Sequence, residues 1–345
     1  MNSSTELGNI ITLQRGYDLP NRDRISGPYP IISSSGISGT HNEYKVSGEN
    51  VITGRYGTIG EVYYYSGKCW PLNTSLFVKD FHGNNTRYSY YLLKHALKML
   101  KIDGKDKSTV PGVDRNVLHQ LKVPFIPSVS CQKEIVHILE LLDKKIENNM
   151  QINDNLFAMS RAIYLHSFFG KKENTKISDV LLENKKSSIQ VGEAKDSQGN
   201  YPFFTSGAAI YEWPEYLVEG KNIYLNTGGN ADVKYYVGKA AYSTDTWCIS
   251  AKNDLTDYLY LLLDSIKPEL DQKFFQGTGL KHLQKPLIKD RKIYMPSTDE
   301  LATFNSQVSQ MLVKISMNTR ENQNLADLRD WLLPMLMNGQ AIISI

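Results

Sequence analysis

The sequence has few cysteines and no long apolar run, and each shortage excludes a class of protein. Its three cysteines, Cys69, Cys131 and Cys248, are far apart and odd in number, so they indicate neither a disulfide framework nor a metal site. No run approaches the roughly 18 apolar residues of a membrane-spanning helix. The opening residues MNSSTELGNI lack the basic and apolar segments of a signal peptide. We therefore expect a cytoplasmic protein with reduced thiols.

Motifs that carry catalysis are also lacking. There is no Walker loop, no His-Glu-x-x-His motif and no glycine-rich nucleotide loop behind a strand. The glycines of GRYGTIG, at positions 54–60, have the wrong spacing for such a loop and indicate a turn. Asp179 and the later Glu193-Ala194-Lys195 match a metal nuclease motif only loosely, because no strand is predicted to hold them. We expect no catalytic residue, no metal site and no cofactor in this chain.

Two long segments predict helices of the coiled-coil type, because apolar residues recur in them about every 3.5 positions. The first helix spans 131–170 and the second spans 299–338. In the first, seam position a contains Ile135, Leu142, Asn149, Leu156 and Ile163, and position d contains Ile138, Ile152 and Met159. In the second, position a contains Leu301, Val308, Ile315, Asn322 and Leu336, and position d contains Phe304, Met311, Leu325 and Leu332.

We expect these two helices to pack on each other in antiparallel orientation, because such a seam needs a partner helix. Asn149 and Asn322 would lie inside the seam, where a polar residue fixes the register of the pair. Arg329 interrupts position a of the second helix, and we expect its neighbour Leu328 to take that place. The alternative is two separate amphipathic helices that belong to two different cores.

The sequence contains an internal repeat, in which the stretch from Tyr29 matches the stretch from Tyr201 without a gap, at an offset of 172 residues. The matched pairs are Tyr29/Tyr201, Pro30/Pro202, Ser34/Ser206, Tyr44/Tyr216, Val46/Val218, Gly48/Gly220, Asn50/Asn222, Gly57/Gly229, Tyr64/Tyr236 and Thr74/Thr246. Further along, Pro127-Ser128 matches Pro296-Ser297, and Gly170 matches Gly339. Short β-branched runs between turn residues predict that each repeat begins with a β-rich domain. Apolar periodicity adds helices near 86–101, 114–121 and 256–267.

We therefore expect an α+β fold of two tandem β-rich domains, separated and held by two long antiparallel coiled-coil helices, with pseudo-twofold symmetry. The expected boundaries are 1–128 for the first domain, 129–170 for the central helix, 171–297 for the second domain and 298–345 for the C-terminal helix.

Basic residues gather behind each β-rich stretch, although the formal net charge is only +3. The first cluster contains Lys94, Lys98, Lys101, Lys105, Lys107, Arg115 and Lys122, and the second contains Lys267, Lys273, Lys281, Lys285, Lys289, Arg291 and Lys292. Basic side chains beside hydroxyl groups suit phosphate contacts, whereas the alternative is a solvated helix face with interspersed carboxylates. Two clusters at matching places favour one ligand with a repeating backbone, as DNA has.

The loops differ most between the matched halves. The loop SSSGISGTHNEY corresponds to TSGAAIYEWPEY, and RYGTIGEV corresponds to NTGGNADV. Loops on a constant scaffold often carry recognition. Two copies with different loops are therefore expected to recognise two different sequences.

The chain resembles the specificity subunits of type I restriction–modification systems. The resemblance rests on the segments ENVITGRYGTIGEVYYYSGKCWPLNTSLFV, KNIYLNTGGNADVKYYVGKAAYSTDTWCIS, VPFIPSVSCQKEIVHILELLDKKI and IYMPSTDELATFNSQVSQML, and on their tandem order. It implies two target recognition domains that each read half of a bipartite site on double-stranded DNA, and long helices that set the spacing and dock two methyltransferase subunits. Restriction subunits would join for cleavage. S-adenosylmethionine would bind the methyltransferase, and ATP and magnesium the restriction subunit.

Within that picture, loop side chains are expected to contact bases. In the first domain they are Ser34, Ser35, Thr40, His41, Arg55, Tyr56, Thr58, Trp70, Asn73 and Thr74, and in the second Thr205, Ser206, Trp213, Thr227, Asn230, Tyr242 and Thr246. Phosphate contacts are expected from Lys105, Lys107, Ser108, Arg115, Gln276, Thr278, Lys281 and His282. For each residue, the alternative is a turn former or a structural polar group. For the whole chain, the alternatives are a coiled-coil scaffold that binds only proteins and an enzyme whose active site is not visible in the sequence.

Overall fold

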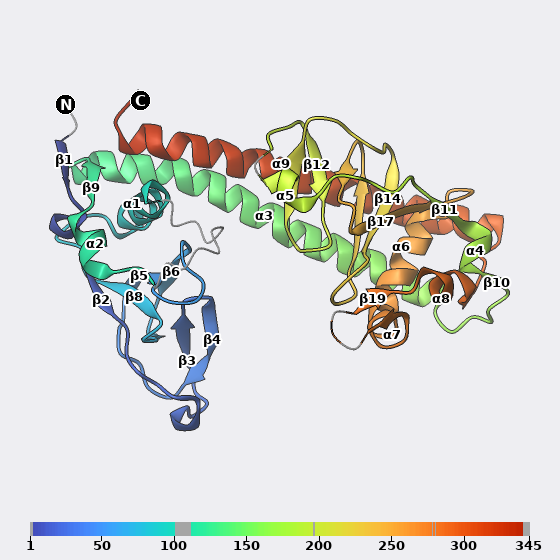
Figure 1. Ribbon diagram of the computed structural model, residues 1–345, viewed down its shortest axis with the longest axis horizontal. Coiled ribbons are helices and arrows are strands. Elements are labelled where there is room, and N and C mark those ends of the chain that lie inside the picture. The colour runs from blue at the N-terminus through green and yellow to red at the C-terminus, as the bar shows by residue number, and fades with distance from the viewer. Residues whose placement is uncertain (1–2, 101–111, 196, 278, 280, 341–345) are drawn as a thin grey trace. The chain divides into compact units, whose positions relative to one another are not determined.

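The computed structural model describes residues 3–100, 112–195, 197–277, 279 and 281–340. The chain forms two compact units. The first unit comprises residues 1–144 and 325–345, and the second unit comprises residues 145–324. Two long helices, α3 (Val129–Phe168) and α9 (Thr298–Met337), contribute residues to both units (Figure 1). Both helices begin and end within two residues of the predicted bounds, so this prediction is confirmed.

The first unit contains a four-stranded sheet in the order β2-β8-β5-β6, a three-stranded sheet in the order β4-β3-β7, and the pair β1–β9. The strands are β1 (Ser3–Glu6), β2 (Thr12–Arg15), β3 (Tyr29–Ser33), β4 (Gly36–His41), β5 (Glu49–Gly54), β6 (Val62–Ser66), β7 (Trp70–Pro71), β8 (Ser75–Asp80) and β9 (Lys122–Phe125). The predicted short helices are present as α1 (Thr86–Met99) and α2 (Arg115–Gln120).

The second unit has the same arrangement, with a four-stranded sheet β11-β17-β14-β15, a three-stranded sheet β13-β12-β16 and the pairs β10–β20 and β18–β19. Its strands are β10 (Thr175–Lys176), β11 (Leu181–Glu183), β12 (Tyr201–Phe204), β13 (Ile210–Trp213), β14 (Lys221–Asn226), β15 (Val233–Val237), β16 (Ala241–Tyr242), β17 (Thr246–Ala251), β18 (Phe275–Gln276), β19 (His282–Leu283) and β20 (Lys292–Ile293). Its short helices are α4 (Ile177–Val180), α5 (Val191–Lys195), α6 (Thr256–Ser265), α7 (Lys267–Glu269) and α8 (Lys285–Asp290). The predicted repeat of β-rich units is thus confirmed at the level of strand order.

The match between the repeats is not free of gaps, however. Tyr64 on β6 lies opposite Val51 on β5, whereas Tyr235 on β15 lies opposite Ile223 on β14. Tyr235, and not Tyr236, is therefore the counterpart of Tyr64. The physical reason is that the loop after β14, residues 227–232, is one residue shorter than the loop after β5, residues 55–61.

The same shift carries through the next strand of each sheet. Ser75 on β8 lies opposite Gly54, and Thr246 on β17 lies opposite Asn226. The sequence match of Thr74 with Thr246 is therefore also wrong, because Thr246 takes the place of Ser75.

Both long helices complete the core of each unit. The first core includes Tyr88 and Leu92 of α1, Leu139 of α3, and Leu333 and Leu336 of α9. The second core includes Ile223, Ile249, Tyr258 of α6, Phe168 of α3 and Phe304 of α9. Each such fully buried side chain contributes about 1.5–3 kcal/mol. Neither unit would therefore keep its core without the segments of the long helices that it contains.

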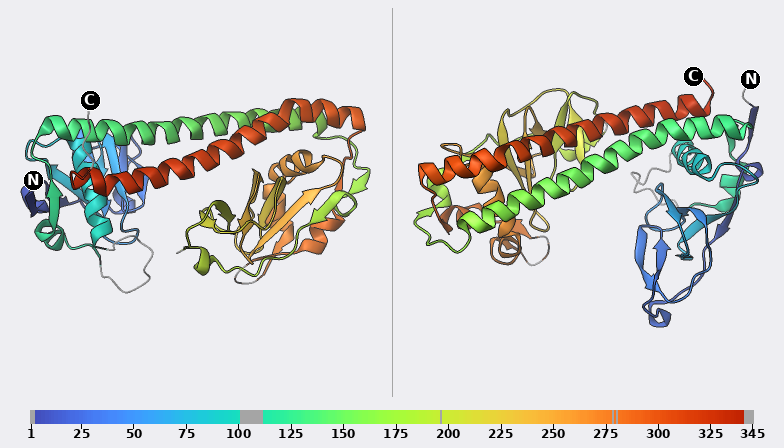
Figure 2. Two further views of the ribbon diagram at one scale, coloured as in Figure 1. Left: turned by 90° about the horizontal axis from the view of Figure 1, so that it is seen from above. Right: turned by 180° about the vertical axis from the view of Figure 1, so that it is seen from behind.

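The two helices run antiparallel, as predicted, and Figure 2 shows them side by side in both views. In the second unit, Asn149 is 1% exposed and donates hydrogen bonds to Glu321 (2.8 Å) and to Asn322 (2.9 Å). Asn318 donates to Asn153 at 2.8 Å. The prediction of buried asparagines at the seam is confirmed for Asn149, and these side chains fix the register of the pair.

One row of the predicted seam is wrong. Ile152 and Met159, which were assigned to position d of the first helix, are 43% and 52% exposed. The seam instead uses the row one residue further on, where Asn153 contacts Asn318 and the fully buried Ser160 donates to the sulfur of Met311 at 3.5 Å. The prediction assigned the seam to apolar residues, whereas in the second unit this row of the seam consists of the polar residues Asn153 and Ser160.

The expectation for Arg329 is also wrong. Leu328 is 42% exposed and does not replace it. In the first unit, the Arg329 guanidinium donates to Asp143 of α3 at 2.8 Å and to Asp330 at 2.9 Å. The Asp143 carboxylate also accepts a hydrogen bond from Tyr91 at 2.6 Å. An ion pair therefore takes the place of an apolar contact at this turn of the seam.

The start of α9 is fixed by a capping box. The Ser297 side chain accepts a hydrogen bond from the Glu300 backbone (3.3 Å), and the Glu300 carboxylate accepts one from the Ser297 backbone (2.8 Å). Lys171 and Tyr294 also donate to this carboxylate. Hydrogen bonds from Lys171, the Ser297 backbone and Tyr294 lower the pKa of Glu300 to about 2. The Glu300 carboxylate thus links Lys171, which follows α3, and Tyr294, which follows β20, to the start of α9.

In each unit, one charged side chain ties the sheet and its helix to a long helix. In the second unit Asp257 of α6 is fully buried and accepts hydrogen bonds from Lys221 of β14 (2.7 Å), Ser309 of α9 (2.5 Å) and Tyr235 (2.5 Å). In the first unit the contact is a half-buried ion pair of opposite polarity. There the side chain of Arg87 of α1 lies 3.1 Å from Glu140 of α3.

Among the described residues, no helix is long and apolar enough to cross a membrane.

Candidate nucleic-acid interface

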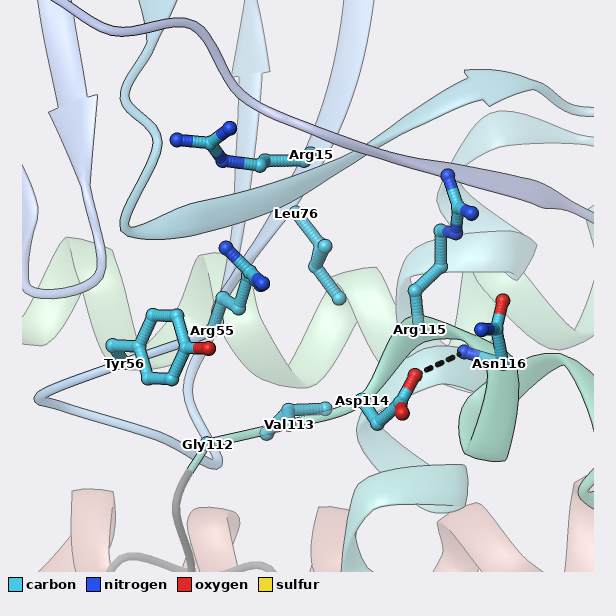
Figure 3. A pocket seen from close by; sticks show the side chains of 9 residues that line it. All are labelled: Arg15, Arg55, Tyr56, Leu76, Gly112, Val113, Asp114, Arg115 and Asn116. Carbon is cyan, nitrogen blue, oxygen red and sulfur yellow. Dashed lines mark hydrogen bonds between the residues drawn. The ribbon is translucent and has the colours of Figure 1, made fainter.

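Three arginines line one cavity of the first unit, which we call the arginine pocket. Its volume is about 610 Å³, and it is lined by Arg15, Arg55, Tyr56, Leu76 and residues 112–116, among which is Arg115. Figure 3 shows the side chains of Arg15, Arg55 and Arg115 among the residues that line this pocket. Arg15 ends β2, Arg55 follows β5 directly, and Arg115 is the first residue of α2. Three separate elements thus bring positive charge to one place.

Backbone hydrogen bonds hold the loop that carries Arg55. The Arg55 amide donates to the carbonyl of Thr74 at 2.8 Å, and the Arg55 carbonyl accepts from the amide of Val113 at 2.9 Å. The Arg55 guanidinium carbon lies 4.5 Å from the centre of the Tyr56 ring, which is a cation–π distance. Loop 55–61 is therefore clamped at its first residue by two different segments.

Gly112 permits the close approach of the second of these segments. Its φ of +115° favours glycine, and a Cβ at this position would lie 2.4 Å from the ring of Tyr56. The backbone at Gly112 therefore packs directly on the aromatic ring. This contact fixes Tyr56, which in turn supports the Arg55 guanidinium.

The pocket carries a net positive charge. Arg15 forms an ion pair with Asp18 at 2.8 Å, in which both side chains are about half exposed or more. The Asp114 carboxylate caps α2 by accepting a hydrogen bond from the Asn116 amide at 2.7 Å. Within the described part of the chain, neither Arg55 nor Arg115 forms an ion pair. Two permanent charges are thus available for an anion.

The second unit holds its corresponding loop in the same way but with different chemistry. The Thr227 amide donates to the backbone carbonyl of Asp245 at 3.0 Å, and the Thr227 carbonyl accepts from the Leu283 amide at 3.0 Å. Thr227 therefore occupies the place of Arg55. Lys285 opens α8 as Arg115 opens α2, but its ammonium lies 4.9 Å from the centre of the Trp247 ring, and burial lowers the pKa of Lys285.

A separate pocket of about 360 Å³ lies elsewhere in the second unit. It is lined by Lys185, Lys186, Ser187, Ser188, Ile189, Trp213, Glu215, Leu217 and Tyr242. Two lysines and two serines in a row give this pocket a basic and hydroxyl-rich wall, which suits a phosphate group.

Several predicted site residues are accessible. In the first unit Ser35, Thr40, Tyr56, Thr58 and Arg115 are exposed, and in the second Asn230, Gln276 and His282 are exposed. Arg55, Asn73, Thr74, Ser206, Trp213, Thr227 and Lys281 are half-buried. The hydroxyl of Thr74 is buried and has no hydrogen-bond partner among the described residues. Contact of these side chains with DNA stays a prediction.

Six of the predicted residues are buried and have partners within the protein: Ser34, His41, Trp70, Thr205, Tyr242 and Thr246. His41 packs edge-on against Trp70, and Thr205 donates to the carbonyl of Ala209 at 2.9 Å. Tyr242 donates to the carbonyl of Lys185 at 2.5 Å. With the contact between the Thr246 and Ser243 hydroxyls (2.9 Å), they give five of the six side chains a structural role. Ser34 is held through its backbone carbonyl, which accepts from the Tyr63 hydroxyl at 3.3 Å. Lys105, Lys107, Ser108 and Thr278 lie outside the described residues.

The second basic cluster is balanced by carboxylates. Its ion pairs are Lys267–Asp264 (2.8 Å), Lys273–Glu269 (3.3 Å), Lys281–Asp271 (3.0 Å), Lys289–Glu183 and Arg291–Glu269 (2.9 Å). In the first cluster Lys98 pairs with Asp330 at 2.8 Å, whereas Lys101 is not among the described residues. The alternative reading of a face with interspersed carboxylates thus describes the second cluster well.

Sequence reasoning missed Arg15, Lys185 and Lys186. Arg15 precedes Arg55 by 40 residues and lies in a strand, so no spacing connects the two. The run NKKSS at 184–188 was visible in the sequence, since it places two lysines directly before two serines.

Two β-rich units of one strand order, each completed by segments of the two long helices, define a tandem-repeat protein. The family model described as type I restriction modification DNA specificity domain matches residues 3–157 and again residues 170–325. The chain therefore belongs to this family. The two matches also coincide with the two halves of the internal repeat.

Known relatives agree with this assignment. The specificity subunit of the type I restriction enzyme MjaIX from Methanocaldococcus jannaschii is 22% identical over 319 residues, with 78% of this chain and 73% of that protein covered. A putative type I specificity subunit of Mycoplasma pneumoniae is 20% identical over 305 residues, with 81% and 76% covered. The crystal structure of a type I S subunit from M. genitalium has the same fold, with a TM-score of 0.63 and 15% identity over 97% of this chain and 96% of that one.

The resemblance inferred from the sequence is thereby confirmed. The chain is a specificity protein of a type I restriction–modification system and not itself an enzyme of that system.

Proposed function

We propose that the chain reads a bipartite site on double-stranded DNA, one part through each β-rich unit, and brings two methyltransferase subunits to that site. The observation that carries this proposal is a constant frame with different loops. Loops 55–61 and 227–232 are clamped by equivalent backbone hydrogen bonds, yet one begins with Arg55 and the other with Thr227. Equivalent loops with different side chains are what two readers of two different half-sites require.

Base recognition is proposed for the exposed polar and aromatic side chains of these loops. Tyr56 is 45% exposed, and Thr58 and Asn230 are exposed as well. Hydroxyl and amide groups can donate to and accept from base edges in the major groove, where the four base pairs differ in pattern. The different loops would therefore give the two units different base preferences.

Docking of methyltransferases is proposed for the long helices. Leu328 in the first unit and Met159 in the second are 42% and 52% exposed, and they occupy matching places in the repeat, at the offset of 169 that relates Gly170 to Gly339. Trp331 beside Leu328 is 58% exposed. Exposed apolar side chains of this size suit a protein partner, and matching positions suit two copies of one partner.

In this proposal the chain acts in the cytoplasm and uses the cofactors of its partners. S-adenosylmethionine belongs to the methyltransferase subunits, and ATP and magnesium belong to restriction subunits that join for cleavage. The competing function is a scaffold that binds only proteins. The arginine pocket favours the DNA reader, because a protein scaffold has no need of three arginines around one cavity.

The test is to express the chain together with a methyltransferase subunit of its own system in a methylation-free host. Modified adenines are then mapped by single-molecule sequencing. A motif of two short specific parts around a fixed gap supports the proposal. No new methylation, with both proteins present and folded, supports the scaffold instead. Replacing Thr227 and Asn230 by alanine should relax one part of the motif only, and replacing Tyr56 and Thr58 should relax the other part only.

A further inference from the structure

The arginine pocket has no equal among the described residues of the second unit. We propose that it binds a phosphate group of the DNA backbone, and that the site at loop 55–61 of the first unit thereby supplies more of the electrostatic attraction to DNA than the equivalent site at loop 227–232 of the second unit. This inference rests on the proposed function, since it assumes that the chain binds double-stranded DNA. It goes beyond that function by assigning one site to the backbone and by making the two units unequal.

Charge and geometry favour a phosphate over a base edge at this site. The three guanidinium groups of Arg15, Arg55 and Arg115 repel one another and are charged at any physiological pH. A base edge is neutral and accepts from one or two donors, whereas a phosphate carries a full negative charge and several acceptor oxygens. One guanidinium group can bind two such oxygens at once through two parallel N–H donors. The volume of about 610 Å³ also leaves room for the adjoining sugar.

The place of the pocket fits a register contact. Arg55 is the first residue of loop 55–61, and the exposed side chains of Tyr56 and Thr58 follow it directly. A phosphate held by Arg55 would therefore fix the DNA beside the side chains that we propose to read bases. Phosphate contacts commonly set the orientation of a protein on the duplex in this way.

The second unit lacks the matching charges. Thr227 stands where Arg55 stands in the first unit, and Lys285, which opens α8, lies against the Trp247 ring. The nearby Lys281 and Lys289 are paired with carboxylates. Its wall of Lys185 and Lys186 belongs to a separate pocket. We therefore assign the second unit fewer phosphate contacts through its loop clamp.

The experiment measures binding of the full-length chain to a fluorescein-labelled duplex of arbitrary sequence by fluorescence anisotropy, over a series of NaCl concentrations. Each phosphate contact adds about 0.9 to the slope of log K against log salt. Arg55→Ala and Arg115→Ala should each lower the magnitude of this slope by a part of that amount, and the double variant, which loses the contact, by about 0.9. Arg55→Lys, which keeps the charge, should keep the slope and lose only part of the affinity.

Two variants serve as matched controls. Arg22→Ala removes an arginine of the first unit that is 86% exposed and lies outside the pocket, and it should leave the slope unchanged. Lys285→Ala removes the counterpart of Arg115, and it should lower the slope by less than half as much. Thermal unfolding of each variant establishes that it is folded before binding is compared.

Each result decides between the proposals. If the wild type binds DNA and the Arg55 and Arg115 variants show the same slope as the wild type, the phosphate site is overturned and the proposed function is left intact. Equal slopes for Lys285→Ala and Arg115→Ala overturn the inequality of the units. The Arg55→Ala variant can also be measured on a duplex that contains the motif mapped by methylation. If it loses affinity for that duplex but binds the arbitrary duplex as the wild type does, Arg55 reads a base, and the phosphate site is overturned. No salt-dependent binding by the wild type overturns both proposals.

Discussion

Replacement of the buried Asp257 by asparagine is expected to destabilise the second unit strongly. The Asp257 carboxylate is fully buried and accepts hydrogen bonds from Lys221, Ser309 and Tyr235. The asparagine keeps the shape but leaves the Lys221 ammonium, 29% exposed, without its counter-charge. Breaking a buried ion pair in this manner typically costs about 3–5 kcal/mol. Because Lys221 is partly in water, we expect a loss near 3 kcal/mol in the free energy of unfolding.

The repeat supplies the matched control at the equivalent place in the first unit. Arg87→Ala breaks the ion pair with Glu140, whose side chains are 39% and 25% exposed. A partly exposed pair of this kind contributes about 1 kcal/mol or less. The Arg87 guanidinium also lies 3.5 Å from the centre of the Tyr64 ring, a contact of about 0.5–1 kcal/mol, so we expect a total loss of about 1–2 kcal/mol. Amide hydrogen exchange, followed by mass spectrometry of peptides from β14 and α6 or from β5 and α1, measures the stability of each unit separately. A loss below 1 kcal/mol for Asp257→Asn, or equal losses for both variants, would show that the buried Asp257 carboxylate does not stabilise the second unit as its contacts indicate.

Three further predictions concern the long helices. The pKa of Glu300 is lowered from its usual value of 4.5 to about 2, so the charged carboxylate stabilises the folded chain at pH values above 4.5, and this stabilisation is lost as the pH falls toward 2. Glu300→Gln should therefore have a lower melting temperature than the wild type at pH 7, and thermal unfolding scans should show the difference shrinking toward pH 2. Arg329→Leu restores the apolar heptad but leaves Asp143 without its partner, so chemical denaturation should show a loss of about 1–3 kcal/mol, which the added change Asp143→Leu partly reverses. The double variant Asn149→Leu/Asn322→Leu removes the polar pair from the seam and should raise the melting temperature, whereas a lower one would show that the pair is a net stabilising contact.

The elements with strong periodicity were predictable. The bounds of α3 and α9 follow from apolar residues that recur over forty positions, and the likeness of the two β-rich units follows from the repeat. The choice between the two seam rows was not predictable. Apolar Ile152 and Met159 are exposed, while polar Asn153 and Ser160 face the partner helix. An apolar side chain indicates a surface that is favourably buried, but it does not indicate whether this chain or another protein buries it.

The site was predictable only in part, for a related reason. Arg55 and Tyr56 stood out because their loop differs between the repeats, and Arg115 because of its basic neighbours. Arg15 could not be connected with them, since the pocket is assembled by strand pairing that brings β2 to β8 and β8 to β5. Burial of loop residues such as His41 was equally invisible, because a turn sequence does not show which of its side chains point inward.

The division of the chain has a consequence for its synthesis on the ribosome. The second unit is contiguous in sequence, whereas the first unit needs both residues 1–144 and residues from 325 onward. The core that contains Leu139 of α3 therefore cannot be completed until Leu333 and Leu336 of α9 have been synthesised. At about 5–20 residues per second, this interval of nearly 200 residues lasts about 10–40 s. The unit whose strands are made first is thus the last to close, and nascent chains expose its unfinished core throughout that time.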